Sequence, residues 1–140
     1  MGGVVVPYAE GLLGHSDADV LIHAICDALL GTIAAGDLGT HFPDSSPEFR
    51  NISSLKLLER VNALLRERDF IIENLDSTVV AQEPRISPYL RQMVDVLSDA
   101  LEIPSRCVNV KAKSTEGLGF AGRGEGIAAY AVVLVKERGV

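Results

Sequence analysis

Three ionisable residues interrupt an apolar stretch near the start of the chain. Asp19, His23 and Asp27 follow one another at intervals of four residues, and most other positions of the stretch are apolar. Side chains four residues apart lie on one face of a helix, so the three share one stripe. Burial of an imidazole between two carboxylates is costly unless a metal, a substrate or a hydrogen-bond network satisfies these groups. With His15 and Ser16 just ahead, the pattern favours a functional site; a core histidine held by its neighbours is the alternative.

A glycine-rich segment near the end of the chain is the second candidate. Residues 117–122 match the GxGxxG pattern, but a dinucleotide-binding fold requires a helix that opens at the third glycine and a second half. More glycines and a β-branched run follow here instead, so we reject that interpretation. The turn carries Ser114, Thr115 and Glu116, and then Arg123 and Glu125. Exposed amides and hydroxyls suit a phosphate, and a neighbouring carboxylate suits a magnesium ion that bridges phosphates; a simple connecting loop is the alternative.

Alternating helices and strands must position these residues. Helical spacing of apolar residues predicts helices over about residues 19–35, 54–68 and 87–103. Runs rich in valine, isoleucine and threonine predict strands over about residues 2–8, 70–81, 107–113 and 127–135. The last run is continuously apolar, which predicts burial on both faces. Residues 36–47 are predicted to form a loop, in which Asp37 and Asp44 are explained as solvated turn formers. We expect an α/β (α+β) fold with a single mixed β-sheet covered on one side by helices.

The composition limits the class of protein. A chain of 140 residues with 47% hydrophobic residues can bury the core of a single domain, residues 1–140. Its formal net charge of −6 argues against a nucleic-acid or anionic-membrane binder, which needs a basic face. Cys26 and Cys107 make no disulfide framework, and no signal peptide or membrane span is recognisable. We expect a cytoplasmic protein with free thiols that binds neither nucleic acid nor membrane.

Several segments together resemble the family of 2-C-methyl-D-erythritol 2,4-cyclodiphosphate synthases. These segments are His15-Ser16-Asp17-Ala18-Asp19 with His23 and Asp27, Gly36-Asp37-Leu38-Gly39, Phe42-Pro43-Asp44, Thr115-Glu116-Gly117-Leu118-Gly119-Phe120 and Gly122-Arg123-Gly124-Glu125-Gly126. The similarity runs from Gly2 to the C-terminus, in order and without large gaps. Enzymes of this family are lyases of the non-mevalonate isoprenoid pathway. They convert 4-diphosphocytidyl-2-C-methyl-D-erythritol 2-phosphate into the cyclic diphosphate and CMP.

The resemblance implies a set of site residues. Those that match groups near the reacting phosphates are His15 and Ser16. Ser114 falls where the family commonly has a threonine hydroxyl, and His15 and Ser114 are the expected catalytic groups. Those that match the substrate pocket are His15, Ser16, Asp37, Leu38, Gly39, Phe42, Pro43, Asp44, Ser45, Ser46, Phe120 and Arg123. Those that match the cytidine pocket are Ala81, Gln82, Glu83, Pro84, Arg85, Ile86, Ser87, Ala112, Lys113, Ser114 and Thr115.

The resemblance also implies metals and an assembly. His23 matches a ligand of Zn2+ or another divalent transition metal, with Asp19 and Asp27 as its support, and Glu116 matches the carboxylate that holds Mg2+ or Mn2+. The subunits are expected to form a homotrimer whose sheets face the three-fold axis and whose active sites lie at the subunit junctions. Phe120, Arg123 and Glu125 match residues of a central cavity, a candidate site for an isoprenoid phosphate.

The chemistry of the reaction agrees with this composition. Two anionic groups of the substrate must meet, so an acidic protein would recruit cations as metals, and no side-chain nucleophile is needed. The family takes two further zinc ligands from an Asp-x-His element upstream of Gly2, and the sequence contains no such element. Because zinc requires three protein ligands, we expect a domain shortened at its N-terminus, with weak zinc binding and impaired turnover. A metal-dependent phosphohydrolase and a noncatalytic trimer of the same family are the alternatives.

Overall fold

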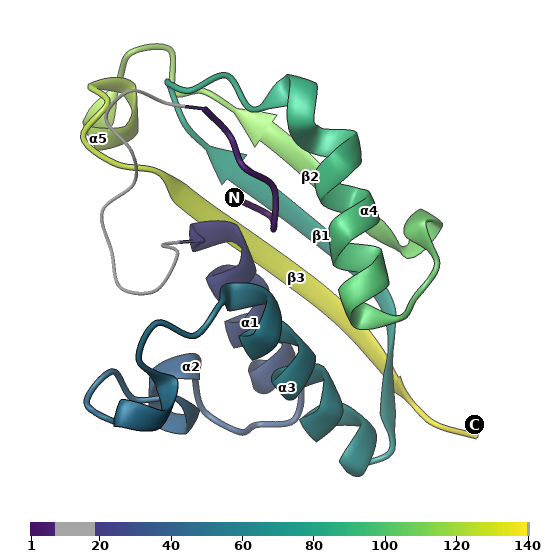
Figure 1. The fold of residues 1–140 in the computed structure, drawn as a ribbon. Coiled ribbons are helices and arrows are strands. Elements are labelled where there is room, and N and C mark those ends of the chain that lie inside the picture. The colour runs from purple at the N-terminus through teal and green to yellow at the C-terminus, as the bar shows by residue number, and fades with distance from the viewer. Residues whose placement is uncertain (8–18, 140) are drawn as a thin grey trace.

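A mixed β-sheet is the centre of the computed structural model, which describes residues 1–7 and 19–139 (Figure 1). Within these residues the sheet has three strands in the order β2-β1-β3. Strand β1 (Phe70–Val80) runs parallel to β2 (Val108–Lys113) and antiparallel to β3 (Ala128–Glu137). The sequence placed each of these strands to within about two residues. The strand predicted over residues 2–8 is wrong for residues 2–7, where Gly2 and Gly3 adopt positive φ angles and no strand forms.

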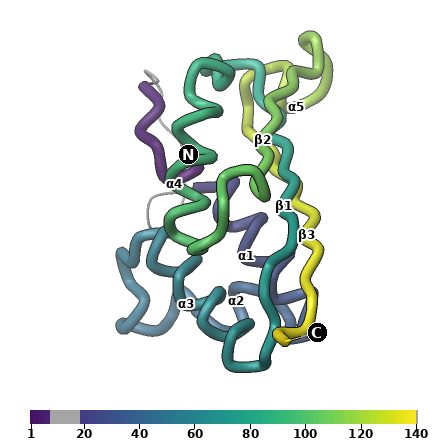
Figure 2. Tube along the Cα trace, turned by 90° about the vertical axis from the view of Figure 1, so that its right-hand side faces the viewer, coloured from purple at the N-terminus to yellow at the C-terminus, as the bar shows by residue number. Residues whose placement is uncertain are grey.

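Helices cover one face of this sheet, as the sequence predicts. The longer helices are α1 (Val20–Thr32), α3 (Ser54–Glu67) and α4 (Leu90–Leu101). The short elements are α2 (Leu38–His41), α5 (Gly119–Gly122) and 3-10 turns at Pro47–Phe49, Ser87–Tyr89 and Ser105–Cys107. Figure 2 views the sheet along its edge and shows α1, α3 and α4 all on one side of it. No helix of the described ranges is long and apolar enough to cross a membrane.

The helix boundaries depart from the prediction where local backbone conformation intervenes. Asp19 caps α1 as expected, because its carboxylate accepts the Ile22 N–H at 3.0 Å. The helix ends at Thr32 and not near residue 35, since Ala34 adopts a left-handed φ of 53°. Ser87 makes no side-chain cap, and a 3-10 turn precedes α4. The predicted loop over residues 36–47 contains α2, which is too short to leave a helical period in the sequence.

The core lies between the helices and the sheet. Leu21, Ile25 and Leu29 of α1 are fully buried, as are Leu58 of α3 and Leu75 of β1. Burial of these apolar side chains stabilises the fold through the hydrophobic effect. No buried side-chain nitrogen or oxygen of the described residues lacks a hydrogen-bond partner.

Both cysteines are free, as predicted. Burial of the Cys26 side chain raises the pKa of its thiol far above the ordinary range, and the carboxylates of Asp27 and Asp19 act in the same direction. The thiolate is the reactive form of cysteine, so Cys26 serves packing and not chemistry.

Within residues 1–7 and 19–139, the opposite face of the sheet carries no helix (Figure 2). Tyr130, Val132 and Leu134 of β3 are 65%, 74% and 58% exposed, while the residues between them pack against the core. The predicted burial of this strand on both faces is therefore wrong for the single chain. The physical reason is that β3 is an antiparallel edge strand with helices on one side, so alternate side chains point away from them.

A polar cluster lies on the same helix-free face, beside the apolar side chains of β3. Lys111 Nζ donates to Asp76 Oδ2 at 2.8 Å, and Asn109 Nδ2 donates to Asp76 Oδ1 at 3.0 Å. The hydrogen bonds from Lys111 and then Asn109 lower the pKa of the Asp76 carboxyl. This cluster ties β1 to β2 from the uncovered side.

The cluster predicts a pH dependence of stability. Because the pKa of Asp76 is lower in the folded than in the unfolded protein, its stabilising effect is present above the ordinary value of 3.8 and is lost as the pH falls through the folded value. We expect D76N to lower the free energy of unfolding at neutral pH and to match the wild type at low pH. Urea unfolding across this range measures the difference. The exposed D99N on α4 is the control; a D76N deficit of the same size well below pH 3.8 would contradict the assignment.

Candidate functional site

Two loops meet at one edge of the sheet. Because β1 and β2 are parallel, their carboxyl ends lie together, and the Ala81 N–H donates to the Lys113 carbonyl at 2.9 Å. One step further along, Gln82 Oε1 accepts the Gly117 N–H at 3.1 Å. Figure 1 shows the segment after β1 and the segment around α5 at the upper edge of the molecule. The structure thus brings together the predicted cytidine residues 81–87 and 112–115 and the turn that carries Glu116.

The turn after β2 is closed by its own hydrogen bonds. Glu116 and Gly117 adopt φ angles of 53° and 83°, and the Glu116 N–H donates to Ser114 Oγ at 3.3 Å. The Thr115 hydroxyl donates to the Leu118 carbonyl. A Cβ atom on Gly122 would lie 2.2 Å from the Gly117 carbonyl carbon, so the two ends of the turn are in direct contact. The exposed side chains of Ser114 and Glu116 therefore project from a tight backbone.

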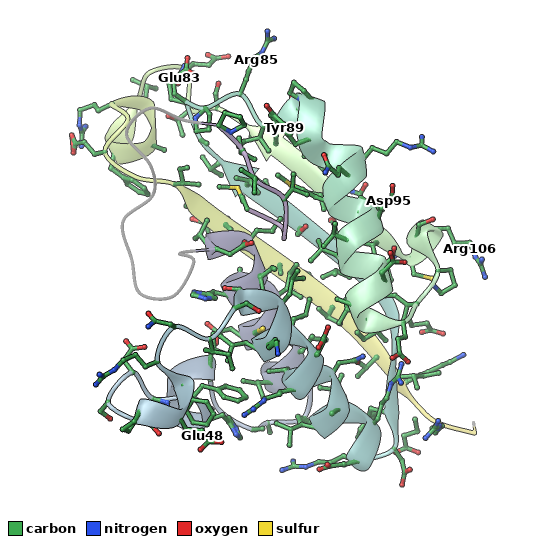
Figure 3. The ribbon with its side chains drawn as sticks, viewed as in Figure 1. Glu48, Glu83, Arg85, Tyr89, Asp95 and Arg106 are labelled. Atoms are coloured by element: carbon green, nitrogen blue, oxygen red, sulfur yellow. The ribbon has the colours of Figure 1, made fainter. Side chains whose placement is uncertain are left out.

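The residues predicted to bind cytidine divide between the core and the solvent. Ala81 and Ile86 are buried, whereas Glu83 and Arg85 are exposed. Figure 3 shows the labelled side chains of Glu83 and Arg85 at the outer tip of the segment, pointing away from the helices. Ile86 thus anchors the segment, and the parts that a base could meet are its backbone and outer side chains.

His23 lies half-buried on α1 with its ring against α3. Its Nε2 atom is 3.1 Å from Oγ of the buried Ser54, the first residue of α3. Sequence reasoning missed Ser54, because a serine at a helix start is read as a cap and nothing relates it to a histidine 31 residues away. The carboxylate of Asp27 accepts the Leu38 N–H at 2.8 Å, so this acid holds the loop that follows α1.

Asp19 binds backbone amides of the chain start. Its two carboxylate oxygens accept the N–H groups of Gly2 and Gly3, each at 2.9 Å. Asp19 is 3% exposed, so these bonds compensate the desolvation of its carboxylate. His15 and Ser16 lie outside the described residues.

Residues 37–46, which the resemblance assigns to the substrate pocket, follow α1 and are joined to it by the bond from the Leu38 N–H to Asp27. Asp37 caps α2 by accepting the Thr40 N–H and hydroxyl at 3.0 and 2.7 Å, and these bonds lower the pKa of its carboxyl. His41 Nε2 donates to the Ala35 carbonyl at 2.6 Å. The rings of Phe42 and Phe49 meet edge to face with centroids 5.1 Å apart. The predicted residues of this segment, Asp37, Leu38, Gly39, Phe42, Pro43, Asp44, Ser45 and Ser46, are all half-buried or exposed.

The single chain does not bring this segment to the loops that are predicted to bind cytidine. Figures 1 and 2 both place α2 toward the lower end of the molecule and α5 at its upper end. Phe120, Arg123 and Glu125 lie at the α5 end, where Arg123 and Glu125 form an exposed ion pair. The predicted site residues thus form two separate groups within the single chain.

The two predicted metal sites fit the described residues unequally. Within residues 1–7 and 19–139, no group of three or more His, Cys, Asp or Glu side chains could hold a metal ion. His23 is accompanied there by Ser54, so the described residues do not assemble a zinc site. Glu116 offers one exposed carboxylate, the kind of oxygen ligand that magnesium takes when its other ligands are water and phosphate.

Comparison with known proteins gives consistent matches over nearly the whole chain. Residues 1–136 match the YgbB family. The 2-C-methyl-D-erythritol 2,4-cyclodiphosphate synthase of Syntrophobacter fumaroxidans is 58% identical over 139 residues, which cover 99% of this chain and 87% of that protein. A 2C-methyl-D-erythritol-2,4-cyclodiphosphate synthase solved in a CDP-bound form superposes with a TM-score of 0.89 at 31% identity, over 96% of this chain and 87% of the other. The bifunctional IspDF of Campylobacter jejuni gives a TM-score of 0.93 at 38% identity, over 97% of this chain and 37% of that longer chain.

The fold and its loops define an α/β domain in which two turns meet at the carboxyl ends of two parallel strands. This chain belongs to the YgbB family, the family of 2-C-methyl-D-erythritol 2,4-cyclodiphosphate synthases. The resemblance noted in the sequence is therefore confirmed.

The contact between Gly122 and Gly117 predicts a large effect of a single methyl group. We expect G122A to lower the free energy of unfolding by about 1–3 kcal/mol, because its Cβ would strike the backbone of the turn. G31A is the matched control: no atom lies within 4 Å of its added Cβ, and alanine stabilises a helix interior by about 0.5–1 kcal/mol relative to glycine. Chemical denaturation measures both variants. Equal effects on stability would contradict the tight turn.

Proposed function

We propose that this chain catalyses the conversion of 4-diphosphocytidyl-2-C-methyl-D-erythritol 2-phosphate into 2-C-methyl-D-erythritol 2,4-cyclodiphosphate and CMP. The observation that carries the proposal is the 58% identity to a synthase of that name over 99% of the chain. The meeting of the 81–87 segment with the turn that carries Glu116 supports it, because a cytidine diphosphate needs a base site next to a phosphate site.

The reaction is an intramolecular phosphoryl transfer. An oxygen of the 2-phosphate forms a bond to the β-phosphorus, and the bond from that phosphorus to the bridging oxygen breaks. CMP leaves with the bridging oxygen and its electron pair, so no water is consumed. The protein has to hold the attacking and leaving groups in line and to offset the repulsion between two anions.

Each group of residues has a proposed part in this reaction. Residues 81–87 and 112–115 bind the cytidine end, and the exposed hydroxyl of Ser114 donates a hydrogen bond to the diphosphate. Glu116 holds Mg2+ or Mn2+, which supplies positive charge to the diphosphate when bound. Residues 37–39 and 42–46 bind the methylerythritol hydroxyls, and His15 and Ser16 are assigned to the reacting phosphates. Zinc at His23 stays a prediction.

The complete site requires a second subunit in this proposal. The residues proposed to bind cytidine and those proposed to bind methylerythritol lie at opposite ends of the molecule in a single chain (Figure 1). A substrate that contacts both sets must therefore lie between two chains. The helix-free face of the sheet, with Tyr130, Val132 and Leu134 exposed, is the proposed contact, because burial of such an apolar patch favours association. The family resemblance makes the assembly a homotrimer with Phe120, Arg123 and Glu125 near its axis, where an isoprenoid phosphate is a candidate ligand.

Product analysis tests the proposed reaction. With Mg2+ and the diphosphocytidyl substrate, we expect equal amounts of CMP and a cyclic diphosphate by phosphorus NMR. E116Q is expected to lower kcat by about 100-fold, since charge stabilisation by one electrostatic group is typically of this size. The exposed E67Q on α3 serves as the control. Release of free phosphate would favour a phosphohydrolase and overturn the proposal, as would CDP binding without any turnover.

Light scattering tests the assembly. We expect a mass three times that of one chain at micromolar concentration, and we expect V132E to shift it toward the monomer because a carboxylate would be buried in the contact. V5E is the matched control, since Val5 is 88% exposed and lies in the segment that packs on the helical side. A monomeric wild type, or equal effects of V132E and V5E, would contradict the proposed contact.

A further inference from the structure

The side chain of Gln82 connects two segments that carry different parts of the nucleotide site. Its Oε1 atom accepts the Gly117 N–H at 3.1 Å, across 35 residues of sequence. Gln82 directly follows Ala81, whose N–H is bound to the Lys113 carbonyl at 2.9 Å. The glutamine therefore extends the parallel ladder of β1 and β2 by one side-chain hydrogen bond, into the turn that carries Glu116.

The turn behaves as a compact unit whose orientation needs an attachment. The Leu118 N–H donates to the Thr115 carbonyl at 3.1 Å, the Thr115 hydroxyl donates back to Leu118, and Gly122 packs on Gly117. These contacts fix the internal shape of the turn. They do not fix the position of the turn relative to residues 81–87. The hydrogen bond from the Gly117 N–H to Gln82 fixes that position.

Gln82 differs from its neighbours in residues 81–87 because its side-chain oxygen is bound to the turn. Because the amide oxygen of Gln82 accepts the Gly117 N–H, it is directed at the turn. Glu83 and Arg85, by contrast, project from the outer tip of the segment (Figure 3). The family resemblance assigns Gln82 to the cytidine-binding residues only by its place in the sequence motif.

We propose that Gln82 is a positioning residue that couples base binding to diphosphate binding. Its amide holds the Gly117 backbone, and with it Ser114 and Glu116, at a set distance from the segment that receives the base. This inference rests on the proposed function, which places a cytidine diphosphate across the two segments. A pre-positioned turn lowers the ordering cost when the diphosphate binds, whereas the base alone gains nothing from it.

Calorimetric titration of two variants separates this coupling from a direct base contact. Q82M keeps the side-chain length but lacks the acceptor, and Q92M makes the same change at an exposed site on α4. With Mg2+ present, we expect Q82M to weaken CDP binding about fivefold, the effect of one neutral hydrogen bond, and to leave cytidine binding within about twofold. Q92M is expected to bind both ligands as the wild type does. Thermal unfolding confirms that each variant is folded.

Hydrogen exchange of the Gly117 amide provides a readout without ligand. We expect the wild type and Q82E, which keeps an acceptor at the same place, to protect this amide, and Q82M to lose the protection. Equal weakening of cytidine and CDP by Q82M would assign Gln82 to the base and overturn the inference. Unchanged CDP affinity, or unchanged Gly117 exchange, would also overturn it. If the wild type fails to bind CDP, both the proposed function and the coupling are wrong. The hydrogen bond between Gln82 and Gly117 is still tested in that case, by the exchange of the Gly117 amide.

Discussion

The parallel pairing of β1 with β2 is the constraint on which the candidate site depends. Two parallel strands end at the same edge, and the Ala81 to Lys113 bond continues the ladder past the last strand residues. The segment that follows β1 and the segment that follows β2 therefore begin within hydrogen-bond distance of each other. The return from β1 to β2 has to cross the sheet, and α4 with its flanking 3-10 turns makes that connection and covers the face. The same pairing that builds the core therefore places the two nucleotide segments side by side.

A second constraint is the one-sided cover of the sheet. The helices bury Leu75, Val79 and their neighbours, and the alternation of β-strands then forces the other set of side chains outward. That set combines the apolar side chains of β3 with the Asp76–Lys111 pair. An exposed apolar strip beside an ordered polar pair suits the proposed contact between chains, since the polar pair restricts how a second chain can lie on the apolar strip. The fold of one chain and the proposed assembly therefore follow from the same alternation.

Several acidic side chains of this chain accept backbone N–H groups and so hold loops and helix ends in place. Asp19 binds the amides of Gly2 and Gly3, Asp27 binds Leu38, and Asp37 binds Thr40. Asp19 and Asp27 were candidates for chemistry on their type and spacing, and Asp37 was one through the family resemblance. An N–H group that has no partner within its own helix or turn is costly, and a short carboxylate satisfies it well, so acids near helix ends often serve the backbone.

Local pattern alone determined the longer helices, the strands after residue 70 and the rejection of a dinucleotide site, because each is encoded by apolar spacing or turn residues within one window of sequence. The motifs around His23 and Glu116 also sufficed to identify the family. Only the tertiary structure decided that Gln82 reaches Gly117, that Ser54 lies on His23 and that β3 is bare on one face. The first two are contacts between residues about 30 or more apart in the sequence, and the third depends on which side of the sheet the helices cover. A pattern within one window of sequence contains no information on either. The sequence records which groups are present, whereas the chain's packing determines which of them meet.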